Sequence, residues 1–219
     1  MVVSSSQRIL TDIWVEAIWD EFVAIADDPV YASCKAYFDS GFMRIEMPPL
    51  GAGHARQNGV IWNVITFFVA AKGMNITSYM NASFTKTGMK GFQPDTAFYI
   101  GEGAKYLPPQ NNSPVSIDLC GPPSLVVEVG ASSLSDDLGA KRMLYERAGI
   151  SEYWVVDVKG KKVVAFDMKD ERSGQIRTSA VLPGLEIDFV EEALRRSQAE
   201  DDGAISQWLM KSFSHDRTE

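Results

Sequence analysis

The chain is poor in the residues that cross-link small folds or hold structural zinc. It has 219 residues, with two cysteines, Cys34 and Cys120, in no CxxC pair, and two histidines. A disulfide framework or a structural zinc site would need more of these residues at closer spacing. We therefore expect one main hydrophobic core with peripheral elements, which a chain of this length with 45% hydrophobic residues can bury.

Long apolar segments and an excess of basic residues are also missing. The longest apolar run, residues 60–71, is too short to span a bilayer and contains Asn63 and Thr66. Residues 1–10 lack the apolar segment of a secretion signal, so we expect a cytoplasmic protein without membrane contact. The formal net charge of −8 argues against tight, sequence-independent binding to a polyphosphate, because that affinity comes from cation contacts. A metal-dependent site for phosphodiesters stays open, since divalent ions require clustered acids.

The centre of the chain predicts a β-α-β unit. Residues 125–129, LVVEV, are a run of branched apolar residues, which is typical of a strand covered on both faces. Residues 136–148 predict a helix that ends at Gly149, and residues 150–158 predict a second buried strand. We expect these strands to be parallel and joined by a right-handed crossover.

Glu128 interrupts the first of these strands. Side chains alternate between the two faces of a strand, so Val126 and Glu128 share one face and the other apolar residues share the opposite one. Burying an ionised carboxylate there is costly unless a cation or strong donors meet it. A metal ion is the cation that this position suggests.

Asp95 supplies the second acid of a candidate metal site. It follows Pro94 at the start of a strand predicted over residues 96–100. Two carboxylates from adjacent strands can hold one or two Mg²⁺ ions, which bind a phosphate oxygen and lower the pKa of a water molecule. Lys141, on the first turns of the predicted helix, is placed to bring positive charge to the reacting phosphate. This combination predicts a metal-dependent nuclease.

The rest of the chain predicts an α/β arrangement around this unit. A hairpin is expected where Asp39-Ser40-Gly41 separates two apolar segments, because glycine accepts the positive φ of such a turn. The other expected elements are a helix over 11–27, a helix over 51–71, strands over 74–81 and 83–87, a long loop over 101–123, a meander over 161–181, and helices over 190–197 and 205–213.

Several segments carry a resemblance to a known family. They include Pro94-Asp95, Glu128 within LVVEV, and the string SLSDDLGAKRMLYERAGISEYWVVDV that ends at Val158. The segments RIEMPPLGAGH, PDTAFYIGE, VLPGLEI and EEAL extend it over most of the chain. Together they resemble the Uma family of bacterial restriction endonuclease-like proteins, members of the PD-(D/E)XK nuclease superfamily.

The resemblance implies a fold, a cofactor and a set of site residues. The fold would be a restriction-endonuclease-like α/β fold with a mixed central sheet of four or five strands and flanking helices. Asp95 and Glu128 would bind Mg²⁺, with Mn²⁺ as a substitute, and Glu46 and His54 would border the pocket. The superfamily pattern has a lysine two residues after the acid, where this chain has Gly130, so the lysine role would pass to Lys141.

The implied substrate is DNA, cleaved as by an endonuclease. Cutting both strands needs two sites related by symmetry, so we expect a homodimer. The expected organisation is a tail and helix over residues 1–34, a nuclease-like domain over 35–190 and a helical extension over 191–219.

Each candidate residue also has a structural interpretation. Glu128 could pair with an arginine or a hydroxyl, and Asp95 could cap a turn after Pro94. Lys141 and Glu46 could face solvent, and His54 could hold a loop. The matching alternative for the whole chain is a catalytically inactive nuclease-fold module that serves binding or assembly. Hydrolysis of RNA or of a nucleotide also stays open.

Overall fold

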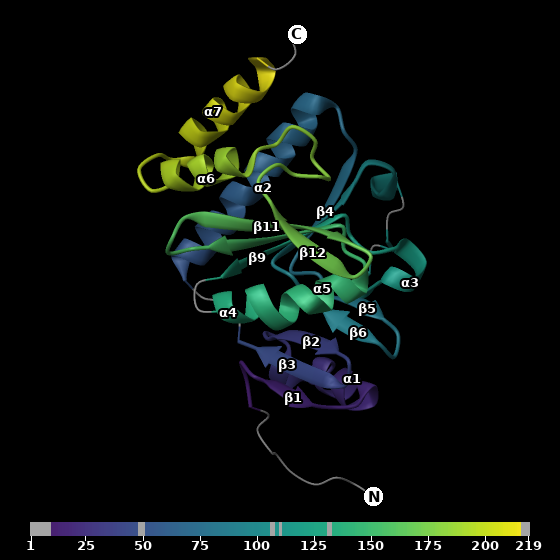
Figure 1. The fold of residues 1–219 in the computed structure, drawn as a ribbon. Helices are drawn as coiled ribbons and strands as arrows, with labels where there is room; N and C mark the ends of the chain where they lie inside the picture. Colours follow the sequence, from purple (N-terminus) through teal and green to yellow (C-terminus); the bar gives the residue numbers. More distant parts are fainter. Residues whose placement is uncertain (1–9, 48–50, 106–107, 110, 131–132, 216–219) are drawn as a thin grey trace, which may run out of the picture.

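The fold is α/β, with two mixed β-sheets flanked by helices (Figure 1), which confirms the predicted fold class. The computed structural model describes residues 10–47, 51–105, 108–109, 111–130 and 133–215. The tail predicted before residue 10 and the end after residue 215 lie outside the described residues.

The central sheet has six strands. In chain order they are β4 (Ile76–Met80), β7 (Thr96–Ile100), β9 (Leu125–Gly130), β10 (Glu152–Asp157), β11 (Lys162–Lys169) and β12 (Arg172–Ile176). Their spatial order is β12-β11-β10-β9-β7-β4. The implied four or five strands were too few, because the half-exposed edge strands β4 and β12 extend the buried centre of the sheet.

The predicted β-α-β unit is confirmed. β9 and β10 are parallel neighbours, and the segment between them is helical. It consists of α4 (Leu134–Asp136), a π-helical turn η3 (Asp137–Lys141) and α5 (Arg142–Ala148), and it ends at Gly149 with a φ of 81°. Glycine adopts this left-handed conformation without the steric cost that a side chain would add.

A second sheet packs against one face of the central sheet. Its strands are β1 (Trp14–Glu16), β2 (Lys35–Asp39), β3 (Phe42–Glu46), β5 (Phe84–Lys86), β6 (Lys90–Phe92) and β8 (Val115–Ser116), in the order β1-β3-β2-β6-β5-β8. The predicted hairpin is β2 and β3. Ser40 and Gly41, at its turn, have φ values of 51° and 82°, as a two-residue hairpin turn requires.

The helix predicted over residues 11–27 is wrong at its start. Residues 14–16 form β1, which pairs antiparallel with β3 at the edge of the second sheet. The helix α1 (Trp19–Ala26) begins only afterwards, where Glu21 accepts a hydrogen bond from the Ile18 backbone N–H at 3.0 Å. Pairing with a distant strand decides the conformation of residues 14–16, and a helical pattern of apolar residues contains no information about that partner. The chain leaves α1 before Pro29, as predicted, and enters the short 3₁₀ helix η1 (Pro29–Tyr31).

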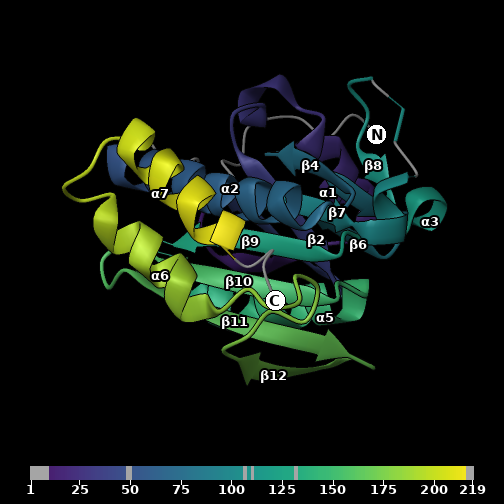
Figure 2. The same ribbon diagram turned by 90° about the horizontal axis from the view of Figure 1, so that it is seen from above.

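Three helices cover the other face of the central sheet. They are α2 (Ala52–Lys72), α6 (Ile187–Arg196) and α7 (Asp202–His215), and Figure 2 shows them side by side above the strands. α2 begins after Gly51 and ends at Gly73, whose φ is 65°, close to the predicted limits. α6 begins three residues earlier than predicted. Among the described residues, none of the helices is both long enough and apolar enough to cross a membrane.

The segment predicted as a long loop contains short elements. They are the 3₁₀ helix η2 (Gly101–Lys105), β8 and α3 (Ile117–Cys120). β8 pairs with β5 over two residues only, which is too short to leave a periodic pattern in the sequence.

The strand β9 separates two buried clusters, and its alternation follows the prediction. Leu125, Val127 and Val129 pack with the helices α2, α6 and α7. Val126 packs in the cluster between the two sheets, with Tyr37 and other aromatic residues. Glu128 therefore points into the space between the sheets.

Candidate functional site

The structure brings the five predicted site residues together in one cluster of contacts around Asp95 and Glu128. They come from separate elements: Glu46 from β3, His54 from the first turn of α2, Asp95 from the residue before β7, Glu128 from β9 and Lys141 from η3. All five are buried. The antiparallel register pairs Thr96 with Val127, so one step further along it sets Asp95 opposite Glu128.

Asp95 is fixed by donors on one of its oxygens. Oδ2 accepts a hydrogen bond from the Val129 backbone N–H at 2.7 Å and lies 3.1 Å from His54 Nε2. Oδ1 lies 2.5 Å from the Nζ of Lys35. Burial alone would raise the pKa of Asp95, but the His54 hydrogen bond and the Lys35 charge hold that pKa well below its ordinary value. Asp95 is therefore an ionised carboxylate in a fixed orientation.

Glu128 is held by hydroxyls on one oxygen and flanked by lysines. Oε1 accepts hydrogen bonds from the hydroxyls of Tyr145 at 2.6 Å and Tyr37 at 3.1 Å. Oε1 lies 3.7 Å from Lys141 Nζ, and Oε2 lies 3.6 Å from Lys35 Nζ. Burial raises the pKa of Glu128 to about 7, although both lysines lower it. The structural interpretation of Glu128 as a hydroxyl-bonded acid thus describes two of its contacts, and no arginine meets it among the described residues.

Lys141 lies inside the protein because of the π-helical turn. The turn directs both Asp137 and Lys141 inward, and single π turns of this kind are frequent at functional sites. Lys141 Nζ lies 2.8 Å from Glu46 Oε2, 2.9 Å from Asp137 Oδ1 and 4.5 Å from the centre of the Tyr37 ring. Burial lowers the pKa of Lys141, but the surrounding carboxylates raise it above its ordinary value. The side chain is therefore a charged, buried ammonium and not a solvent-exposed helix lysine.

Several residues of this cluster were not predicted from the sequence. Lys35 and Tyr37 are two positions apart on β2, so both side chains point to the face that meets the central sheet. The predicted hairpin implies that these two side chains share a face. It does not indicate which other sheet that face would contact. Asp137 and Tyr145, from the segment predicted as a helix, also contact the site. Arg44 joins them, with Nε 3.2 Å from Glu46 Oε2 and 3.3 Å from Asp136 Oδ2.

Acidic side chains outnumber basic ones in this cluster, with five acids facing three lysine or arginine side chains. The acids are Glu46, Asp95, Glu128, Asp136 and Asp137, and the bases are Lys35, Arg44 and Lys141. Carboxylate oxygens, and two acids in excess of the bases, fit one hard divalent cation. Within the described residues, no three histidine, cysteine or acidic side chains already form a metal cage.

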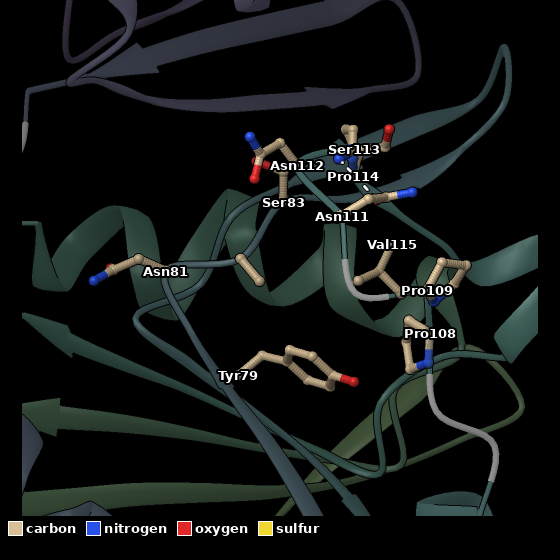
Figure 3. Close-up of a pocket in the computed structure, with 11 residues that line it drawn as sticks. Tyr79, Asn81, Ser83, Pro108, Pro109, Asn111, Asn112, Ser113, Pro114 and Val115 are labelled. Carbon is tan, nitrogen blue, oxygen red and sulfur yellow. Dashed lines mark hydrogen bonds between the residues drawn. The ribbon is translucent and has the colours of Figure 1, made fainter.

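A hollow adjoins the site without containing it. It measures about 520 Å³ and lies between the end of β4 and residues 108–115. Figure 3 shows uncharged side chains around it, with the Tyr79 hydroxyl directed toward Pro108. The backbone N–H of Asn81, at its rim, donates to the carbonyl of Asp95 at 3.1 Å. Its lining residues include no carboxylate, lysine, arginine or histidine side chain.

The fold of two mixed sheets with flanking helices is shared with a solved structure. A crystal structure described as a putative nuclease belonging to DUF820, from Anabaena variabilis, shares the fold, with a TM-score of 0.54 at 15% identity. The match covers 81% of this chain and 98% of that one.

The sequence comparison defines the family. The Uma2 family, described as "Putative restriction endonuclease", matches residues 19–200, and the chain belongs to this family. The resemblance seen in the sequence is thereby confirmed. No curated protein matches the chain. Family and fold together support a nuclease function.

Proposed function

We propose that the protein is a Mg²⁺-dependent endonuclease that hydrolyses DNA phosphodiester bonds. Asp95 and Glu128 are the proposed ligands, and Mn²⁺ would substitute for Mg²⁺. The observation that carries this proposal is that the two carboxylates, from neighbouring strands, face the same single cation, the Lys35 ammonium. The excess of acids over bases in the same cluster supports a divalent ion there, because such an ion would favour the ionised form of Glu128.

The proposed division of roles follows from the contacts. The divalent ion, when bound, would supply Lewis-acid activation of the phosphate and of water. His54 and the Val129 N–H orient Asp95, and the tyrosine hydroxyls orient Glu128. Lys141 is the proposed cation for the charge that develops on the phosphate, since fixed positive charge is most effective where water is excluded. Glu46 positions Lys141 through its 2.8 Å ion pair.

Plasmid cleavage in Mg²⁺ tests this proposal. We expect the purified protein to cut plasmid DNA and the double variant Asp95→Ala, Glu128→Ala to be inactive. A matched control is Glu191→Ala, which removes a buried carboxylate that pairs with Lys162 and Arg177 beyond the site. Cleavage that survives the double variant, or is lost equally in the control, would contradict the assignment. Single-stranded RNA and free nucleotides in parallel reactions separate DNA cleavage from the other hydrolytic functions.

The second candidate is a catalytically inactive module for binding or assembly. The observation that favours it is that Lys35 already neutralises the space between the two acids. This candidate predicts no heat of Mn²⁺ binding in calorimetry. A binding signal that Glu128→Ala abolishes would eliminate it.

We further propose a homodimer, because cleavage of both DNA strands needs two sites. Sedimentation at micromolar concentration would show a species of twice the chain mass. A monomer alone would remove the dimer and leave the chemistry of the single site intact.

A further inference from the structure

Lys35 is the buried base whose ammonium group contacts both proposed metal ligands, Asp95 and Glu128. It is the first residue of β2 and is 5% exposed. Its Nζ lies 2.5 Å from Asp95 Oδ1 and 3.6 Å from Glu128 Oε2. Lys141 approaches Glu128 from its other oxygen, Oε1, and has its closest contacts with Glu46 and Asp137. Lys35 alone therefore lies between the two proposed ligands, among the described residues.

The remaining oxygens of these acids are already committed to fixed donors. Asp95 Oδ2 faces the Val129 N–H and His54, and Glu128 Oε1 accepts from two tyrosine hydroxyls. These donors belong to the backbone or to buried side chains that packing holds in place. The oxygens left for a further cation are Asp95 Oδ1 and Glu128 Oε2. Both face Lys35 Nζ, so a cation that binds both acids must take the place of this ammonium.

Lys35 also stays charged in this position. Its Nζ forms ion pairs with both carboxylates, which favour the ammonium form. A charged ammonium and a divalent cation repel each other strongly at contact distance in a buried site. The lysine head group is a point charge on a flexible four-carbon stem, so it can withdraw without moving the strand.

We propose that Lys35 is the internal counter-ion of this site, which holds the two acids together in the metal-free protein and exchanges with the divalent cation. Lys35 is then the residue that sets the metal affinity. The inference rests on the proposed metal-dependent function and adds a residue that acts against metal binding. Its consequence is that removing the lysine tightens metal binding and weakens the metal-free fold.

Calorimetric titration with Mn²⁺ tests this exchange without any measurement of cleavage. We expect Lys35→Met to bind Mn²⁺ at least about tenfold more tightly than the unmodified protein, because a competing unit charge is gone. Lys90→Met is the matched control. Lys90 is also 5% exposed and lies 2.6 Å from one carboxylate, Asp39, which keeps Arg147 as a second partner. The control should bind Mn²⁺ as the unmodified protein does.

The outcomes separate the inference from the function on which it rests. If the unmodified protein binds Mn²⁺ and Lys35→Met binds it equally or more weakly, Lys35 is not a competitor and the inference is wrong. If neither protein binds Mn²⁺, the metal-dependent function is wrong as well. Lys35→Gln keeps a donor for Asp95 without the charge, and serves where the methionine variant does not fold. Lys35→Gln should show the same gain in Mn²⁺ affinity. Its melting temperature should also rise more on adding Mn²⁺ than that of the unmodified protein.

Discussion

At the scale of single residues, the proposed metal site depends on the environment of Glu128. A carboxylate inside a sheet is disfavoured by desolvation, and here two hydroxyls and two ammonium groups compensate only in part. The position of this acid followed from alternation along the strand. Its partners did not, because Tyr37 and Lys35 come from the second sheet and Lys141 depends on a π-helical turn that leaves no sequence pattern.

The pH dependence of unfolding tests the burial of Glu128. Its pKa rises from 4.5 in a free side chain to about 7, so the folded metal-free protein binds more protons than the unfolded chain between these values. Glu128 therefore lowers the free energy of unfolding as the pH increases through this window, by on the order of 3 kcal/mol in all. We expect urea unfolding in EDTA to show this loss between pH 5 and 8, relative to Glu128→Gln. Parallel pH profiles for the two proteins would contradict a raised pKa of Glu128 in the folded protein.

Glu46 offers a test of positioning against ligation. Its closest site contact is Lys141 and not the space between Asp95 and Glu128. We expect Glu46→Gln to lower kcat by roughly tenfold to a hundredfold, because a misplaced catalytic group loses this much. The Mn²⁺ dissociation constant should stay within a factor of about three. A large loss of Mn²⁺ affinity would make Glu46 a ligand instead.

At the scale of elements, local patterns predicted what local interactions determine. The hairpin of β2 and β3, the limits of α2 and the β-α-β unit were correct, because turn residues, glycine stops and buried apolar runs specify them directly. Residues 14–16 were placed in a helix and are a strand. Their apolar spacing suits both, and only the distant partner β3 decides. The short β8 escaped prediction because two residues leave no periodic pattern in the sequence.

Packing of α1 on the second sheet gives an element-scale prediction. A Cβ atom added at Gly91 of β6 would overlap the Phe22 ring of α1. We expect Gly91→Ala to lower the free energy of unfolding by about 1 to 3 kcal/mol, as overpacking does. Gly174→Ala in β12 is the control, because nothing lies within 4 Å of its added Cβ. Chemical denaturation measures both, and equal stability of the two variants would mean that α1 does not pack as described.

At the scale of the whole molecule, the site exists only where two sheets meet. Lys35 and Glu46 come from the second sheet, Asp95 and Glu128 from the central sheet, and His54 and Lys141 from helical segments. The sequence indicated the acids of the central sheet but not that the second sheet would pack over them. That contact joins residues far apart in the chain, 60 positions for Lys35 and Asp95 and 91 for Tyr37 and Glu128. The division into residues 1–34, 35–190 and 191–219 stays a prediction, which limited proteolysis can test.

The central claim is that one divalent cation belongs between Asp95 and Glu128. A crystal structure of the protein soaked in Mn²⁺, with anomalous scattering recorded for manganese, tests it most directly. We predict an anomalous peak shared by Asp95 Oδ1 and Glu128 Oε2, with the Lys35 ammonium withdrawn from its place between them. A structure in which Lys35 still joins the two acids and no manganese lies beside them would contradict the account.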